Sequence, residues 1–145
     1  MPVPETPRLT VDVIIRLCDR PGLPILLIER RYPPLGWALP GGFVDRGERV
    51  EEAAVREARE ETSLDVRLDC LLGCYSDPAR DPRGHTASLV YLASATGEPR
   101  AADDARALRL LGPFGDWPQL AFDHGLILAD YRRFLETGRL APLRF

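Results

Sequence analysis

The sequence contains no lysine and no asparagine, and its only methionine is the first residue. All 19 basic residues are therefore arginine, whose planar guanidinium can donate two hydrogen bonds to one phosphate group. The formal net charge is −3, and the arginines form no basic region of the kind that a general nucleic-acid-binding protein carries. We therefore expect no nucleic-acid partner, and arginine is the only strong cation available to an anionic small molecule.

Cysteine is scarce, and long hydrophobic runs are absent. The three cysteines, Cys18, Cys70 and Cys74, are too few for a disulfide framework, so we expect a protein of the reducing cytoplasm. The longest apolar stretches, such as residues 23–28, are far shorter than the roughly 20 residues of a membrane-spanning helix. The first residues also lack the pattern of a signal peptide, and we expect no membrane partner.

The length and composition indicate one globular domain. The chain has 145 residues, of which 45% are hydrophobic and 28% are charged, and it contains no internal repeat or long linker. We therefore expect a single domain over residues 1–145.

The periodicity of the sequence predicts strands and two helices. The segment 105–111 fits either a strand or a helical turn. A chain of strands with helices at two separate points suggests an α/β protein with a mixed β-sheet sandwiched between α-helices, although the order of the strands does not follow from the pattern. The expected strands are 11–17, 25–31, 37–39, 64–75 and 86–95, and the expected helices are 48–62 and 122–135.

The helix expected over 48–62 carries acidic residues on the side that should face the protein. At 100° per residue, its small residues Ala53, Ala54 and Ala58 form one stripe beside Val50. In the last turns the same side is acidic, because it carries Glu57, Glu60 and Glu61. Like charges at this spacing repel, and burying them without partners is costly. A hard divalent cation such as Mg²⁺, which prefers carboxylate oxygens, is the natural counter-charge.

An ordinary solvent-exposed helix is the alternative, with its acids paired by Arg56 and Arg59, and charge content alone favours it. The two glycines before the helix, Gly41 and Gly42, favour the metal site instead. Two successive glycines let the backbone pass very close to another group, and the Gly41 carbonyl could be a further oxygen ligand.

The same residues resemble the signature of the Nudix family. That signature is a glycine, five residues, a glutamate, seven residues, and then Arg-Glu-aliphatic-any-Glu-Glu-any-Gly-aliphatic. Here it runs from Gly42 through Glu48 to the segment 56–64, with every charged position present. Two uncharged positions depart from it, because Ala58 replaces a larger aliphatic residue and Ser63 replaces glycine.

The resemblance implies a Nudix fold and hydrolysis of a nucleoside diphosphate linked to another group. It implies Glu57 and Glu61 as the main metal ligands, with Glu60 sharing the metal and the Gly41 carbonyl assisting. Arg56 would orient Glu57, and Glu48 would brace the loop by an ion pair. Mg²⁺, or Mn²⁺ in its place, would be the cofactor. The general base stays open between Glu57 or Glu60 on the helix and Asp103 or Asp104 on a distant loop.

The segment 75–85, together with 120–124, resembles more loosely a subgroup that includes ADP-ribose pyrophosphatases, which form AMP and ribose 5-phosphate. Beside a pyrophosphate site, Arg80 and Arg83 become candidate substrate contacts, as do Arg30 and Arg31 at a strand end. Trp37 is a candidate for stacking on adenine. His85 and His124 lack metal-ligand spacing and are expected to be structural.

We therefore expect an ADP-ribose pyrophosphatase. Two alternatives are the same chemistry on another nucleotide, such as an oxidised nucleoside triphosphate, a dinucleoside polyphosphate or NADH, and a module that senses ADP-ribose without cleaving it. Sensors of this kind usually carry a DNA-binding domain or lack some of the acids, and this chain keeps every acid. The sequence leaves open whether the protein is a homodimer.

Overall fold

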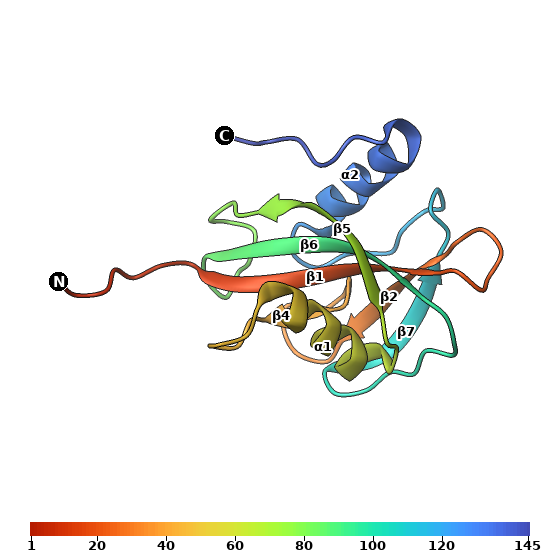
Figure 1. The fold of residues 1–145 in the computed structure, drawn as a ribbon, viewed down its shortest axis with the longest axis horizontal. Coiled ribbons are helices and arrows are strands. Elements are labelled where there is room, and N and C mark those ends of the chain that lie inside the picture. Colours follow the sequence, from red (N-terminus) through yellow and green to blue (C-terminus); the bar gives the residue numbers. More distant parts are fainter.

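The computed structural model describes residues 1–145, and a mixed seven-stranded sheet lies at its centre (Figure 1). This arrangement confirms the expected α/β class with a mixed sheet between helices. The elements in chain order are β1 (Arg8–Leu17), β2 (Ile25–Arg30), β3 (Trp37–Ala38), β4 (Gly41–Phe43), α1 (Val50–Thr62), β5 (Arg67–Tyr75), β6 (Thr86–Ala95), β7 (Ala105–Leu111) and α2 (His124–Thr137).

The strand β1 is central to the sheet, whose main order is β3-β2-β1-β6-β5. It runs parallel to β6 along its whole length, from the pair Arg8 and Thr86 to the pair Leu17 and Ala95. All other pairings are antiparallel, including β4 with β1 and β7 with β2. Because β4 pairs with the first half of β1, it brings the two glycines to the centre of the molecule.

The two helices cover opposite faces of the sheet. Alternate residues of β1, such as Val11 and Val13, pack with the small residues of α1 in one core. Ile14, which points to the other face, packs with Ile127 and Tyr131 of α2 in a second core. The alternation of side chains along one buried strand therefore separates the layer of α1 from the layer of α2.

The observed bounds differ from the predictions at the starts of both helices and of two strands. The strand β1 begins at Arg8 rather than at residue 11, β5 begins at Arg67 rather than at residue 64, and the short strand β4 was not predicted. The strand predicted over 86–95 is confirmed, and 105–111 is a strand because it pairs with β2. The helix predicted from residue 48 begins at Val50, because Arg49 has an extended backbone and leaves Glu48 in the preceding loop. The second helix begins at His124 rather than at residue 122, because Phe122 has a left-handed backbone with a φ of 55°.

The end of α1 explains one departure from the family signature. Ser63 follows the helix with a φ of 64°, and its N–H donates to the carbonyl of Arg59. This left-handed position is the one that glycine favours at the end of a helix. Serine here therefore affects how the helix ends and not the acidic residues before it.

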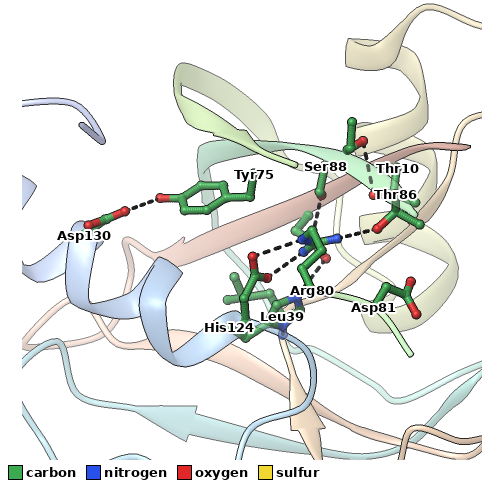
Figure 2. A network of polar contacts seen from close by, with 12 residues as sticks. Thr10, Leu39, Tyr75, Arg80, Asp81, Thr86, Ser88, His124 and Asp130 are labelled. Atoms are coloured by element: carbon green, nitrogen blue, oxygen red, sulfur yellow. Dashed lines mark hydrogen bonds and ion pairs between the residues drawn. The ribbon is translucent and has the colours of Figure 1, made fainter. Parts of the chain in front are cut away.

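The C-terminal segment returns to β5 and α2. The N–H of Ala141 donates to the carbonyl of Leu72, and Arg144 makes two hydrogen bonds of 2.8 Å to Asp130. The carboxylate of Asp130 also accepts a hydrogen bond from the Tyr75 hydroxyl at 2.7 Å (Figure 2). Neither α1 nor α2 has the length and apolar character that crossing a membrane requires.

Candidate active site

A polar cleft opens where β1, β4 and α1 meet the loops before β6, β7 and α2. It brings together most of the side chains that the sequence singled out. Four of its 17 lining residues are hydrophobic, so the cleft suits a charged ligand better than an apolar one. The charged lining residues are Asp12, Arg30, Asp45, Glu57, Glu61, Arg80, Asp81, Arg83 and Asp104.

The backbone from Leu39 to Gly41 is anchored to three different elements. The N–H of Leu39 donates to Nδ1 of His124 in α2 at 3.0 Å. The Pro40 carbonyl accepts from the N–H of Val13 in β1 at 2.8 Å, and the N–H of Gly41 donates to Oε2 of Glu61 in α1 at 3.0 Å. Three consecutive residues therefore hold this segment between both helical layers and the sheet.

Gly41 and Gly42 both lie so close to other atoms of the protein that a side chain at either position would cause a collision. A Cβ atom on Gly41 would collide with the carbonyl oxygen of Val11, and a Cβ atom on Gly42 would collide with the carboxylate of Glu57. The expectation that the glycine pair lets the backbone pass close to another group is therefore confirmed.

Glu57 and Glu61 are the two acids of α1 that line the cleft. Burial raises the pKa of Glu57 to about 7, against the lowering effect of its hydrogen bond from Arg56. Burial raises the pKa of Glu61 to about 8, against the hydrogen bond from Gly41. The nearby charges of Asp12 and Asp104 raise the pKa of Glu61 further. The cleft therefore gathers more negative charge than its immediate partners neutralise.

Glu60 lies apart from this pair. Its side chain is 42% exposed, against 13% for Glu57, and it does not line the cleft. Arg56 donates to both carboxylates, at 2.9 Å to Glu57 and 3.1 Å to Glu60. The other side of the same guanidinium makes two hydrogen bonds to Glu48, which holds the pKa of Glu48 down at about 2. Arg56 thus joins the loop before α1 to two of the three acids.

The residues of the cleft fit a divalent cation by the chemistry of their donors, although no three acidic, histidine or cysteine side chains are grouped closely enough to hold one as they stand. The available donors are carboxylate oxygens of Glu57 and Glu61 and backbone oxygens of the glycine segment, which is the donor set that Mg²⁺ accepts. Burial is the main cause that disfavours the charged form of both carboxyls, and a bound cation would offset that effect.

A buried polar network, which the sequence did not predict, forms the floor of the cleft (Figure 2). Its centre is Asp12 of β1, which is 8% exposed and accepts a hydrogen bond from the Ser88 hydroxyl. Nε2 of His124 lies 3.4 Å from Asp12 Oδ1, and Nη2 of Arg80 lies 3.8 Å from Asp12 Oδ2. Asp12 is a charged residue within an otherwise apolar stretch of β1. This charge in a buried strand was the one feature of the sequence that could have indicated the network.

Arg80 is engaged by the protein itself. Its side chain is 3% exposed, and its guanidinium makes two hydrogen bonds to Asp123, at 3.0 and 2.7 Å, and one to Thr86 at 2.8 Å. Burial lowers its pKa, but the bonds to Asp123 and the nearby Asp12 reverse this, and the net shift is upward. All three nitrogens therefore contact protein, which differs from the expected substrate contact, and Arg80 supports the floor of the cleft.

Arg30 and Arg83 both reach the cleft beside the aromatic ring of Phe122. Their Cζ atoms lie 4.8 and 5.2 Å from the centre of the Phe122 ring, and Arg83 also lies 5.0 Å from the ring centre of Phe43. Burial lowers the pKa of Arg30, and the facing charge of Arg83 lowers it further. Two neighbouring cations that repel each other in a cleft favour an anion that contacts both.

Two further candidate contacts lie outside the cleft, which is a difference from the expectation. Arg31 is exposed, and Trp37 packs in the core beneath α2 with its ring 5.8 Å from Arg109 Cζ. The aromatic side chains that line the cleft are Phe43 and Phe122. Of the two loop acids, Asp104 lines the cleft and Asp103 does not.

Comparison with known proteins gives a family match. A model of the NUDIX domain matches residues 6–123. The chain is 47% identical over 131 residues to an ADP-ribose pyrophosphatase of Methanocaldococcus jannaschii, an alignment that covers 88% of this chain and 75% of that protein.

Two solved structures are similar in fold. One is a bifunctional NMN adenylyltransferase/ADP ribose pyrophosphatase of Francisella tularensis, complexed with AMP and a Mn ion, with 29% identity and a TM-score of 0.75 over 90% of this chain and 42% of that one. The other is the NUDIX domain of Shewanella oneidensis NrtR complexed with ADP ribose, with 26% identity and a TM-score of 0.73 over 90% of each chain.

Proposed function

Because this chain belongs to the Nudix hydrolase family, we propose that it is a Mg²⁺-dependent pyrophosphohydrolase that cleaves ADP-ribose to AMP and ribose 5-phosphate. The observation that carries the proposal is the pair of buried carboxylates, Glu57 and Glu61, against the glycine segment of a cleft that Arg30 and Arg83 also line. Acids and guanidiniums in one cleft suit a diphosphate that binds together with a cation.

In this proposal Glu57, Glu61 and the Gly41 carbonyl would hold the cation, with Glu60, which is exposed in this structure, as a further carboxylate of the set. When bound, Mg²⁺ supplies neutralisation of the phosphate oxygens and a water made more acidic; Mn²⁺ is a possible substitute. The protein's own side chains position the metal-binding carboxylates. Arg56 keeps Glu57 aimed at the glycine segment, and Glu48 fixes Arg56 by two hydrogen bonds.

The substrate's phosphates would contact Arg83 and Arg30. Arg83 is held by Asp81 through Nε and Nη2, at 3.1 and 2.9 Å, so its guanidinium is oriented before substrate arrives. Such preorganisation reduces the cost of binding. Phe43 and Phe122, rather than Trp37, offer aromatic surface inside the cleft.

We propose that the general base is one of the two candidate acids that line the cleft. Glu57 and Asp104 line the cleft, whereas Glu60 and Asp103 do not. A general base must reach the attacking water directly or through one further water, so we propose Glu57 first and Asp104 second.

ADP-ribose is favoured among nucleotide substrates by the similarity to the Methanocaldococcus jannaschii enzyme, which covers most of this chain.

The three cysteines are free, which agrees with the reducing cytoplasm as the compartment.

The test is product analysis by ion-exchange chromatography with Mg²⁺ present. Purified protein would be offered ADP-ribose, NADH, diadenosine tetraphosphate and 8-oxo-dGTP in parallel. We expect AMP and ribose 5-phosphate from ADP-ribose at the highest kcat/KM, and no products when EDTA removes the metal. A preference for another nucleotide would overturn the substrate, and tight ADP-ribose binding without turnover would identify a sensor.

A further inference from the structure

We propose that His124 is a positioning residue that holds the metal-binding glycine segment in place from the opposite helical layer. The inference rests on the proposed function, because it concerns the segment that would bind the cation. It begins from a contact across 85 positions of the sequence, in which the backbone N–H of Leu39 donates to Nδ1 of His124 at 3.0 Å (Figure 2).

This contact is buried, and the acceptor for the Leu39 N–H is a side-chain nitrogen rather than the backbone carbonyl of a neighbouring strand. His124 is 1% exposed and Leu39 is 2% exposed, so water cannot replace the ring nitrogen. A buried N–H without an acceptor is costly, and the backbone would move to recover one. The position of Leu39 therefore depends on His124.

The contact also fixes which nitrogen of the ring carries the proton. Nδ1 accepts a hydrogen bond, so in the neutral ring the proton is on Nε2. Nε2 is buried and makes no hydrogen bond, and Asp12 Oδ1 lies 3.4 Å from it. Asp12 is itself oriented by the Ser88 hydroxyl. The ring is thus held between the glycine segment on one side and a β1 carboxylate on the other.

The start of α2 is anchored independently. Asp123, the residue before His124, accepts two hydrogen bonds from the buried guanidinium of Arg80, and Thr86 fixes the third nitrogen of that guanidinium. His124 therefore projects from a rigid point rather than from a free helix end. In this proposal Arg80 and its partners serve the site by fixing the position of His124, without contacting substrate.

The consequence reaches the acids of α1 through Gly41. Leu39 lies two residues before Gly41, whose N–H donates to Glu61 and which lies so close to Val11 that an added Cβ would meet its carbonyl oxygen. A displacement at Leu39 would move the Gly41 carbonyl and loosen Glu61 together. His124 therefore acts on metal affinity without being a metal ligand.

Two conservative variants separate this role from general support of the fold. In His124→Asn, the amide oxygen can occupy the position of Nδ1 and accept from Leu39. In His124→Gln, the amide lies at the position of Nε2, so the contact with Asp12 is retained and the acceptor for Leu39 is lost. His124→Leu removes both. Mn²⁺ binding would be measured without nucleotide by electron paramagnetic resonance, and amide exchange of Leu39 and Gly41 by NMR on the metal-free protein.

We expect His124→Asn to bind Mn²⁺ within about threefold of wild type, and His124→Gln and His124→Leu to bind it at least about tenfold more weakly. Exchange at Leu39 should be faster in the two weaker variants only. Equal effects of Asn and Gln, or wild-type binding and exchange in all three, would overturn the inference; if the leucine variant fails to fold, the Asn and Gln pair still decides it. If wild type binds no Mn²⁺, the proposed function fails, and the exchange rates alone decide the role of His124.

Discussion

Gly42 and Glu57 are in such close contact that a methyl group on the glycine would overlap the carboxylate of the glutamate. Gly41, one residue earlier, has its conflict with the backbone carbonyl of Val11 instead. Adjacent glycines therefore face different kinds of neighbour. Gly42 touches the end of a flexible side chain, whereas Gly41 touches the backbone of a central strand, which can make room only if the strand shifts.

This difference predicts opposite consequences for two alanine variants. Gly42→Ala should fold, since Glu57 can rotate away, but it should lower kcat for ADP-ribose by at least about tenfold, because the displaced carboxylate is a proposed metal ligand. Gly41→Ala should lower the free energy of unfolding by about 1–3 kcal/mol, because β1 must shift. Urea unfolding and steady-state kinetics on both variants would check this. A Gly42→Ala enzyme with normal kcat would contradict the claim that the close contact between Gly42 and Glu57 positions this carboxylate for catalysis.

Spacing within one helix made much of the site predictable. Glu57 and Glu61 follow from the turn of α1, and the glycines follow from their place before it, because all of these relationships are local. Asp12 was missed, because its partners Ser88 and His124 lie far along the chain and meet it only when β1 pairs with β6 and α2 covers the sheet.

Arg80 was predicted to contact substrate because its partner, like those of Asp12, is distant in the sequence. Its place beside Arg83 in a polar loop suggested a substrate contact, but a sequence does not reveal that Asp123 will pair with one arginine and leave the other facing the cleft. The strand 105–111 was ambiguous for a similar reason, since its identity depends on pairing with β2. Elements with strong local signals were predictable, and partnerships across the sheet were not.

Arg83→Ala should raise KM for ADP-ribose more than it lowers kcat, because the proposed phosphate contact exists before the transition state. Arg31→Ala is the matched control, since Arg31 is exposed and outside the cleft. We expect KM to rise by about tenfold or more for Arg83→Ala, the loss of a charge-assisted hydrogen bond, and to change little for Arg31→Ala. Equal KM values for the two variants would remove Arg83 from the substrate site.

Ser63→Gly should stabilise the protein by about 1 kcal/mol, because Ser63 adopts a left-handed conformation that costs a side-chain-bearing residue more than glycine. The change restores the residue of the family signature and should leave kcat unaltered. The midpoint of urea unfolding would rise at constant slope. A lower midpoint would show that the hydrogen bond from the Ser63 hydroxyl to Arg100 outweighs the backbone cost.

Asp130 predicts a pH dependence of stability. Burial would raise its pKa, but hydrogen bonds from Arg144 and Tyr75 outweigh that effect and lower the pKa below its usual value. A carboxyl with a lowered folded-state pKa stabilises the protein above its unfolded-state pKa of about 4, and this contribution is lost as pH falls through the folded-state pKa.

Asp130→Asn should therefore reduce the free energy of unfolding by about 1–2 kcal/mol at pH 7, with a smaller difference below pH 4. Urea titrations at pH 7, 5 and 3.5 would measure the difference. An equal loss at every pH would assign the effect to packing rather than to charge.

The central claim is that Glu57 and Glu61 hold the cation that the reaction needs, and ADP-ribose turnover as a function of Mg²⁺ concentration tests it most directly. Glu57→Gln and Glu61→Gln should each lower kcat at least about 100-fold at saturating Mg²⁺. Glu51→Gln, an exposed acid in the first turn of the same helix, should behave like wild type. Near-normal turnover in both cleft variants, or wild-type turnover that persists in EDTA, would contradict the account.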